Sequence, residues 1–299
     1  MDKIYKHQVS LLLSVLPEVS KENSFALHGG TAINLFIRDM PRLSVDIDLT
    51  YLPIEDRETS HRSIADALQR IKRNIEYVIP SVRITPRLDD GKLYVSSNGV
   101  NIKIEVNLVN RGTLAKPQEM PLCNKAQNIF DSFCVMSVVP RGQLYGGKIV
   151  AALDRQHPRD LFDVKYLLEE NGFTDEVKKG FLLCLLCSDR PINEVIKPNF
   201  QDQRSAHENQ FAGMSDEAFS YEEFEATRAR LVETVNAALT EKDKSFLLSI
   251  KDVNPDWSIY DFQRFPSINW KLQNLKKLKT NNPDKHKEIF ERLKEKLNN

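Results

Sequence analysis

Apolar and polar residues along the first half of the chain follow two different periods. Between residues 100 and 109 (VNIKIEVNLV) every second residue is apolar, which is typical of a half-buried β-strand. Over residues 3–20 and 56–79 apolar residues instead recur every three or four positions, which predicts amphipathic helices. The chain therefore mixes strands and helices within its first hundred residues.

The same patterns place the remaining elements. Asp89-Asp90-Gly91 separates two strand patterns and indicates a hairpin turn. Residues 110–121 are irregular, and nearly everything after residue 174 reads as helix and loop. Further strands are predicted at 24–28, 44–51, 82–88, 92–97 and 132–139, and further helices at 31–38, 143–153 and 159–170.

This order of elements predicts an α+β fold. We expect a small mixed, mainly antiparallel β-sheet with helices on one face, followed by a mainly helical C-terminal region. We place the boundary near residue 140, giving a catalytic core at 1–140 and a helical domain at 141–299 that completes an active-site cleft.

Composition excludes several protein classes. The 299 residues carry 42 basic and 42 acidic side chains, so no excess of positive charge marks the whole chain for nucleic acid, although a local basic face remains possible. No apolar run approaches the roughly 20 residues of a membrane span, and a cytoplasmic location is expected. Cys184 and Cys187 lie in an apolar helical run, FLLCLLC, which favours buried core residues over a zinc or redox site.

Two carboxylates, Asp46 and Asp48, are separated by one apolar residue in a predicted strand. Residues i and i+2 of a strand project to the same face, so the two charges lie together while Ile47 and Leu49 face a core. Because like charges repel, a divalent cation such as Mg²⁺ is the natural occupant between them. The alternative is a solvated strand face.

Gly29-Gly30-Thr31 stands about fifteen residues before this pair, between a short strand and a helix start. The free backbone N–H groups of such a helix start form an anion site. A phosphate site followed closely by a metal site predicts phosphoryl or nucleotidyl transfer.

Glu105 lies on the polar face of the alternating strand. If that strand neighbours the Asp46 strand, Glu105 completes the metal site and takes the proton of an attacking hydroxyl. The alternative is a cross-strand ion pair with Lys103 or another surface lysine.

Lys148 precedes an apolar helix and is a candidate to hold a phosphate as a point charge. The preceding Gly146-Gly147 is not a P-loop, because Ile149 stands where that motif requires Ser or Thr. Asp160 and Asp163 share one helix face beside Arg159, as either site residues or capping charges.

The C-terminal segment 271–299 carries nine Lys or Arg and four Asp or Glu, a net charge of +5. Such a segment suits either an RNA backbone or a solvated helix face.

Together, GGT, R-x-S-x-DIDL, the K-x-x-A helix, R-D-x-x-D and the closing FPSINWKLQNLKKLK resemble the AbiEii toxin family of nucleotidyltransferases, within the DNA-polymerase-β-like superfamily. The resemblance covers almost the whole chain. It implies a toxin of a type IV toxin–antitoxin or phage-defence (abortive-infection) system. It also implies a cognate antitoxin, usually a DNA-binding repressor, and NMP transfer from an NTP with Mg²⁺ or Mn²⁺, in some members to the 3′ end of tRNA.

The resemblance also implies residue roles. Gly30 and Thr31 contact the triphosphate, Ser44 lies at the nucleotide pocket, and Lys148 binds phosphate. Either Asp160 or Asp163 fills the late acidic position, with Arg159 beside it. The alternatives are transfer to a protein or a small molecule, or a non-catalytic nucleotide-binding regulatory module.

Overall fold

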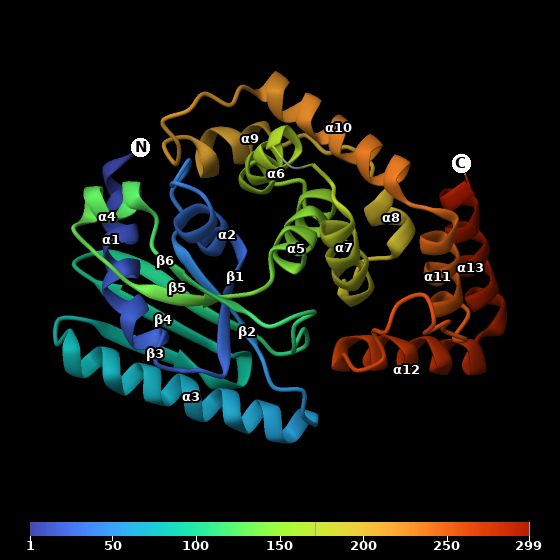
Figure 1. The fold of residues 1–299 in the computed structure, drawn as a ribbon, viewed down its shortest axis with the longest axis horizontal. Coiled ribbons are helices and arrows are strands. Elements are labelled where there is room, and N and C mark those ends of the chain that lie inside the picture. Colours follow the sequence, from blue (N-terminus) through green and yellow to red (C-terminus); the bar gives the residue numbers. More distant parts are fainter. Residues whose placement is uncertain (171, 299) are drawn as a thin grey trace. The chain divides into compact units, whose positions relative to one another are not determined.

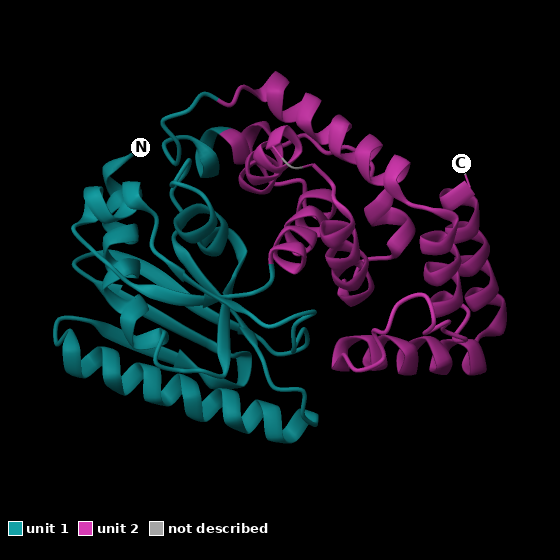
Figure 2. Cartoon of the chain, in the orientation of Figure 1, with its two compact units in different colours: residues 1–140, 208–218 teal, residues 141–207, 219–299 magenta. Residues whose placement is uncertain are grey.

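The computed structural model describes residues 1–170 and 172–298, which form two compact units (Figure 2). Unit 1 comprises residues 1–140 and 208–218, and unit 2 comprises residues 141–207 and the chain from Phe219 onward. The helical domain expected at 141–299 is thus interrupted by a segment that returns to unit 1.

Unit 1 is built on a seven-stranded sheet with the order β3-β4-β5-β2-β1-β7-β6 (Figure 1). The β2–β5 and β1–β7 pairs are parallel and the other four pairs are antiparallel, so the predicted mixed sheet is confirmed. The strands are β1 (Phe25–His28), β2 (Asp46–Tyr51), β3 (Arg83–Arg87), β4 (Lys92–Ser97), β5 (Val100–Asn107), β6 (Gln118–Pro121) and β7 (Val135–Val138).

Two long helices of unit 1 contact the sheet: α1 (Lys3–Val19) packs against β5, and α3 (Arg57–Val78) packs against β3 and β4 (Figure 1). The α3 helix is capped by Asp56, whose side chain accepts a hydrogen bond from the backbone N–H of Thr59. As the helical spacing predicts, its apolar residues are buried, namely Ile64, Ala67, Leu68, Ile71 and Ile75.

Three local features of unit 1 differ from the sequence prediction. The helix expected at 31–38 is α2 (Gly29–Ala32) continued by a π-helical turn, η1 (Ile33–Ile37). The segment expected to be irregular ends in the edge strand β6, and α4 (Asn124–Phe130) follows it. A 3₁₀ turn, η2 (Leu88–Asp90), forms part of the hairpin between β3 and β4.

The returning segment 208–218 is held to unit 1 by backbone hydrogen bonds. The Leu43 N–H donates to the carbonyl of Met214 at 2.7 Å, and the Asp2 N–H donates to the carbonyl of Gly213 at 2.7 Å. Main-chain groups make these bonds, so no side-chain pattern in the sequence marks them.

Unit 2 is helical, and its α5 helix packs closely on α7. A Cβ atom at Gly146 would lie 2.2 Å from the backbone of Gly180, and one at Gly180 would lie 2.0 Å from the carbonyl of Gly142. These glycines therefore let two helices approach, which fixes the helix that carries Lys148. The helices are α5 (Arg141–Asp154), α6 (Pro158–Glu170), α7 (Asp175–Cys187), α8 (Ile192–Ile196), α9 (Arg204–Ala206), η3 (His207–Phe211, most of it in unit 1), α10 (Tyr221–Ala238), α11 (Glu241–Lys251), α12 (Pro266–Asn281) and α13 (Pro283–Asn298).

Candidate active site

The turn from β1 into α2 brings the backbone against a carboxylate. Gly29 has a φ of +72°, a left-handed conformation that favours glycine. A Cβ atom there would lie 2.3 Å from Oδ2 of Asp48, which pairs with His28 across β1 and β2. Glycine is therefore required at position 29 both by backbone conformation and by the approach of Asp48.

Asp46 and Asp48 project from the same face of β2. Both residues are half-buried, whereas Ile47 and Leu49 between and after them are 0% and 2% exposed. The strand alternation predicted from the sequence therefore holds. Two carboxylates on one strand face, beside the start of α2, match the donor set that a hard divalent cation prefers.

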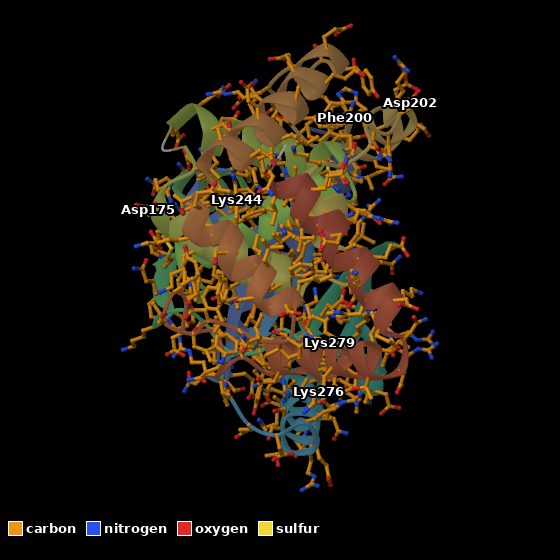
Figure 3. All side chains as sticks on the ribbon, turned by 90° about the vertical axis from the view of Figure 1, so that its right-hand side faces the viewer. Asp175, Phe200, Asp202, Lys244, Lys276 and Lys279 are labelled. Atoms are coloured by element: carbon orange, nitrogen blue, oxygen red, sulfur yellow. The ribbon has the colours of Figure 1, made fainter. Side chains whose placement is uncertain are left out.

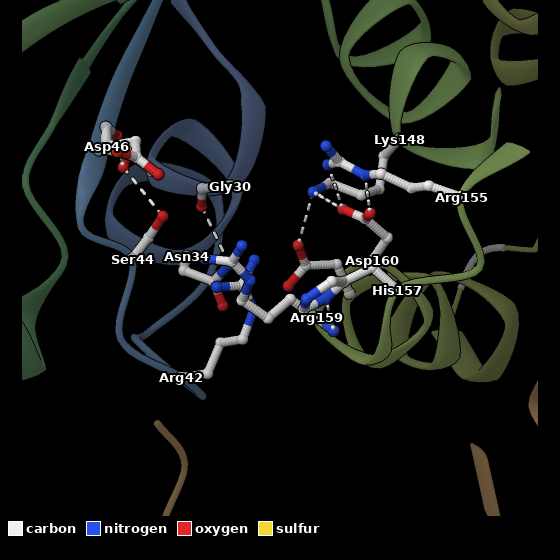
Figure 4. Close-up of polar contacts among 12 residues, drawn as sticks. Gly30, Asn34, Arg42, Ser44, Asp46, Lys148, Arg155, His157, Arg159 and Asp160 are labelled. Carbon is white, nitrogen blue, oxygen red and sulfur yellow. Dashed lines mark hydrogen bonds and ion pairs between the residues drawn. The ribbon is translucent and has the colours of Figure 1, made fainter. Parts of the chain in front are cut away.

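Thr31 and Ser44 are buried beneath this pair. Thr31 Oγ1 lies 3.0 Å from Ser44 Oγ and also donates a hydrogen bond to the backbone carbonyl of Asp46 (Figure 4). These bonds join α2 to the start of β2, so the two hydroxyl groups position Asp46.

Arg42 also lies at the candidate site, and the sequence reasoning missed it. Its side chain is 2% exposed, and its guanidinium approaches the turn so closely that a Cβ atom at Gly30 would lie 2.8 Å from Nη2. Asn34 donates to the carbonyl of Gly30 at 2.9 Å and holds the same turn (Figure 4). A buried arginine beside a glycine turn indicates a possible anion site. Arg42 is the first residue of the R-x-S-x-DIDL motif, so the sequence contained this indication.

Glu105 lies on β5 directly opposite Asp48, because β2 and β5 pair in parallel with Asp48 and Glu105 in register. Its carboxylate oxygens bind two lysines, Lys103 Nζ at 2.6 Å and Lys92 Nζ at 3.2 Å. The structure thus brings Glu105 beside the aspartate pair and also forms the alternative ion pairs, across strands with Lys92 and within β5 with Lys103.

The charges of these residues are coupled. Burial would raise the pKa of Glu105, but the bonds and charges of Lys103 and Lys92 outweigh it and lower this pKa. Burial would lower the pKa of Lys103, but Glu105, Asp46 and Asp48 together raise it. Among residues 1–170 and 172–298, no group of three or more His, Cys, Asp or Glu side chains is arranged to hold a metal ion. A role for Glu105 as a third ligand stays a prediction.

Lys148 forms a second polar group, within unit 2. Its Nζ lies 2.8 Å from Oδ1 of Asp160 and 3.0 Å from Oδ2 of Asp163, with all three side chains at most 6% exposed (Figure 4). Arg155 adds two hydrogen bonds to Asp160 from Nε and Nη2. The arginine, which the sequence reasoning missed, precedes α6 in the DRQHPRD turn.

The two aspartates of this group differ in their partners. Burial would raise the pKa of Asp160, but Lys148 and Arg155 lower it far below its usual range. Asp163 pairs with Lys148. Arg159 is half-buried at the start of α6, where its backbone N–H donates to Nδ1 of His157 at 3.1 Å. Both aspartates therefore remain candidates for the late acidic position.

The family model "Nucleotidyl transferase AbiEii toxin, Type IV TA system" matches residues 10–274. The chain belongs to the AbiEii nucleotidyltransferase toxin family. Its fold is similar to that of MenT4, a nucleotidyltransferase toxin from Mycobacterium tuberculosis H37Rv, with a TM-score of 0.59 over 91% of this chain and 93% of that chain. The identity is 14%, so this likeness concerns the fold alone. A comparison with curated protein sequences gives no match.

The basic C-terminal segment of this AbiEii-family chain forms α12 and α13. Part of its charge is balanced locally, since Lys279 pairs with Asp252 at 2.7 Å and Arg292 pairs with Glu288 at 2.6 Å. Lys276 is exposed on α12 (Figure 3). RNA binding by this segment stays a prediction.

Two further sequence expectations have structural outcomes. Cys184 and Cys187 lie on α7 as free thiols that are half-buried and not fully buried as expected, and burial raises the pKa of Cys187 to about 11. A thiol with so high a pKa is not a reactive nucleophile. Among the described helices, none is long and apolar enough to cross a membrane.

Proposed function

We propose that this AbiEii-family toxin transfers a nucleoside monophosphate from an NTP to an acceptor hydroxyl on RNA, with tRNA 3′ ends as the leading candidates. The observation that carries the proposal is the Gly29–Asp48 contact. A left-handed glycine places the start of α2 directly against a carboxylate of the Asp46/Asp48 pair. In this proposal, the turn that binds an anion and the aspartate pair that binds a cation therefore lie against each other.

Asp46 and Asp48 fit a divalent cation, Mg²⁺ or Mn²⁺, because they offer hard oxygen donors on a single strand face. Such a cation supplies charge neutralisation for a triphosphate and its leaving pyrophosphate. In this proposal, the backbone N–H groups at Gly29 and Gly30 bind the terminal phosphates, and the buried Arg42 adds positive charge at the turn.

Thr31 and Ser44 act in this proposal by holding the turn and the strand in place. Their buried hydroxyl groups already bond to each other and to the backbone of Asp46. Ser44 also lies 3.0 Å from where a side chain at Gly30 would begin, so it lines the same turn.

Glu105 is proposed as a further ligand. A carboxylate whose pKa is lowered is ionised at neutral pH but is a weak base, so the bonds from Lys92 and Lys103 favour the ligand role over proton removal. If a divalent cation took the place of one of the two lysines, the negative charge of the Glu105 carboxylate would stay neutralised.

Lys148 is proposed to bind phosphate, with Asp160 or Asp163 holding its side chain in place. The buried lysine has two carboxylate partners, so its rotamer is fixed. Arg155 and Arg159 are the neighbouring cations on the same turn. The resemblance to the AbiEii family, whose model spans this lysine, supports the phosphate role.

The test is incubation with each α-labelled NTP, a divalent cation, and either cellular RNA or a cellular protein fraction. We expect label on a sized RNA band and its loss on chelation of the metal. Asp48→Asn should lower transfer about a thousandfold, or about 4 kcal/mol. Asp66→Asn, an exposed aspartate on α3, is the matched control and should leave transfer unchanged.

Each alternative has its own outcome. Label in the protein fraction, or on a small molecule, would replace RNA as the acceptor. NTP binding without transfer of label by the wild-type protein would support a regulatory nucleotide-binding module instead. As a toxin, the chain is expected to arrest growth when expressed alone, and co-expression of its cognate antitoxin, proposed to be a DNA-binding repressor, should relieve the arrest.

A further inference from the structure

One face of the sheet extends the candidate site across three strands. The registers between neighbouring strands are continuous, so side chains from β3, β4, β5 and β2 line up on the same face. The first row is Thr85, Tyr94, Lys103 and Asp46, and the second row is Arg87, Lys92, Glu105 and Asp48. The two carboxylates of the candidate site therefore lie at the end of both rows.

This face is basic and accessible within unit 1. We use the term basic sheet face for Arg83, Arg87, Lys92, Tyr94 and Lys103, which with Glu105 leave a net positive charge on β3, β4 and β5. Arg83 and Arg87 are exposed, and Lys92 and Lys103 each keep about a third of their side-chain surface. Leu93 and Val95, which alternate with these polar residues on β4, are 0% exposed and belong to the core on the opposite face of the sheet.

Tyr94 stands in the middle of the basic sheet face with 43% of its surface exposed. In register it faces Thr85 on one side and Lys103 on the other, and Arg83 and Arg87 are its diagonal neighbours on β3. An exposed aromatic ring on an open strand face, surrounded by cations, is the arrangement that binds single-stranded nucleic acid. The ring stacks on a base while the cations contact phosphates.

We propose that the basic sheet face binds the single-stranded end of the acceptor RNA, with Tyr94 stacking on a base and Arg83 and Arg87 contacting phosphates. The proposal rests on the proposed function, because it gives the acceptor of that reaction a place. The rows lead from Tyr94 and Arg87 to Asp46 and Asp48, so a single-stranded RNA lying along them directs its end toward the carboxylate pair.

The positive charge of the basic sheet face favours RNA over other ligands. The whole chain has a formal net charge of zero, so a local cluster of four cations is not a by-product of a basic composition. A cluster of this sign selects a polyanion, and the central aromatic ring selects one with bases. Lys92 and Lys103 also bind Glu105, so the test uses the other three residues.

The first experiment measures binding of a 5′-labelled single-stranded oligoribonucleotide by fluorescence anisotropy, without NTP. Tyr94→Ala should weaken binding about tenfold, the effect of one lost stacking contact, and Tyr94→Phe should bind like the wild type. Tyr77→Ala is the matched control, since Tyr77 is 87% exposed on α3, and it should change nothing.

The second experiment measures the salt dependence of the same binding. Arg83→Gln combined with Arg87→Gln should lower the slope of log K against log salt concentration by about 1.4, the value for two phosphate contacts on a single strand. The control is Arg73→Gln, an exposed arginine on α3. In the transfer assay, Tyr94→Ala should raise KM for RNA about tenfold and leave kcat nearly unchanged.

The outcomes separate this proposal from the proposed function. Wild-type transfer to RNA with unchanged Kd and KM in Tyr94→Ala and the double arginine variant would overturn the sheet-face proposal alone. Absence of transfer by the wild type, with RNA binding that depends on Tyr94, would overturn the proposed function alone. If polyglutamate competed as well as RNA did, the face would be a general polyanion surface and the RNA assignment would be overturned.

Discussion

The two polar groups of this toxin differ in how deeply their charged side chains are buried. Asp46 and Asp48 stand half-buried on a strand face, whereas Lys148, Asp160 and Asp163 are nearly fully buried between helices. Breaking a buried ion pair leaves an uncompensated charge in the interior, while the loss of a half-exposed charge is compensated by water. The buried group therefore stabilises the fold of unit 2 whatever else Lys148 binds, and the strand-face pair is available for chemistry with little structural cost.

The largest effect should follow from removing the cation of the buried group. Lys148→Met leaves Asp160 and Asp163 without the lysine that bonds to both, and we expect a loss of about 3–5 kcal/mol in the free energy of unfolding. Urea denaturation measures this loss.

Two variants control this prediction. Lys276→Met removes an exposed lysine of α12 and should change stability by less than about 0.5 kcal/mol. Combining Lys148→Met with Asp160→Asn and Asp163→Asn should recover part of the loss, since the orphaned charges are removed. A Lys148→Met single variant as stable as the wild type would show that the buried group matters no more for stability than the strand-face pair does.

Gly29→Ala should have the next largest effect, and it acts on both stability and activity. The left-handed backbone costs about 1–2 kcal/mol for alanine, and the added Cβ would displace the carboxylate of Asp48. We therefore expect moderate destabilisation together with loss of transfer activity.

Gly99→Ala is the matched control for that substitution. Gly99 has a φ of +79° but no atom within 4 Å of an added Cβ, so the backbone strain is reproduced without the contact. It should lose similar stability and keep its activity. Equal activity in the two variants would show that the Gly29–Asp48 contact has no catalytic role.

A smaller effect is expected from Arg155→Gln, and it depends on pH. Lys148 and Arg155 lower the pKa of Asp160 in the folded chain, so this ion pairing stabilises the protein above the ordinary aspartate pKa of about 3.9. The stabilisation is lost as the pH falls below that value. Because the Arg155 side chain is 63% exposed, the variant should lose only about 1 kcal/mol at pH 7.

The measurement is urea denaturation of wild type and Arg155→Gln between pH 3 and pH 7. The difference in stability should be constant from pH 5 to pH 7 and should narrow only below about pH 4, as Asp160 is protonated in the folded variant, because protonation in the unfolded chain is common to both proteins. Arg73→Gln is the control, and its difference from wild type should not vary with pH. A difference that widens in acid would contradict the assignment of this charge to Asp160.

Local patterns in the sequence were sufficient for most of the fold of unit 1. The strict alternation of β5 and the helical spacing of α3 locate both elements to within a few residues. The strand β6 was not predicted, because it is a four-residue, largely exposed edge strand with no alternation of apolar and polar residues. The return of residues 208–218 to unit 1 escaped because backbone groups make its bonds.

The shared face of the aspartate pair was predictable from the sequence, but the pairings of the charged residues were not. The aspartate pair follows from strand period alone, since i and i+2 share a face. The placement of Glu105 opposite Asp48 depends on the parallel register of β2 and β5, strands far apart in sequence. Binding of Lys148 to both aspartates likewise depends on how α5 and α6 pack. Residue type indicates chemistry, and long-range pairing decides which charges meet.

The smallest effect on stability should come from Asp48→Asn, the variant expected to lower transfer about a thousandfold. Asn is nearly isosteric with Asp, so it preserves the contact with Gly29 while removing one of two neighbouring negative charges on β2. The lost attraction to Lys103 offsets the relieved repulsion from Asp46, and the net change should lie within about 0.5 kcal/mol. Urea denaturation and the labelled transfer assay on the same preparation test both halves of this prediction. Destabilisation beyond about 2 kcal/mol would show that the strand-face pair, like the buried group, is part of the fold, and the loss of transfer would then no longer identify Asp48 as a ligand.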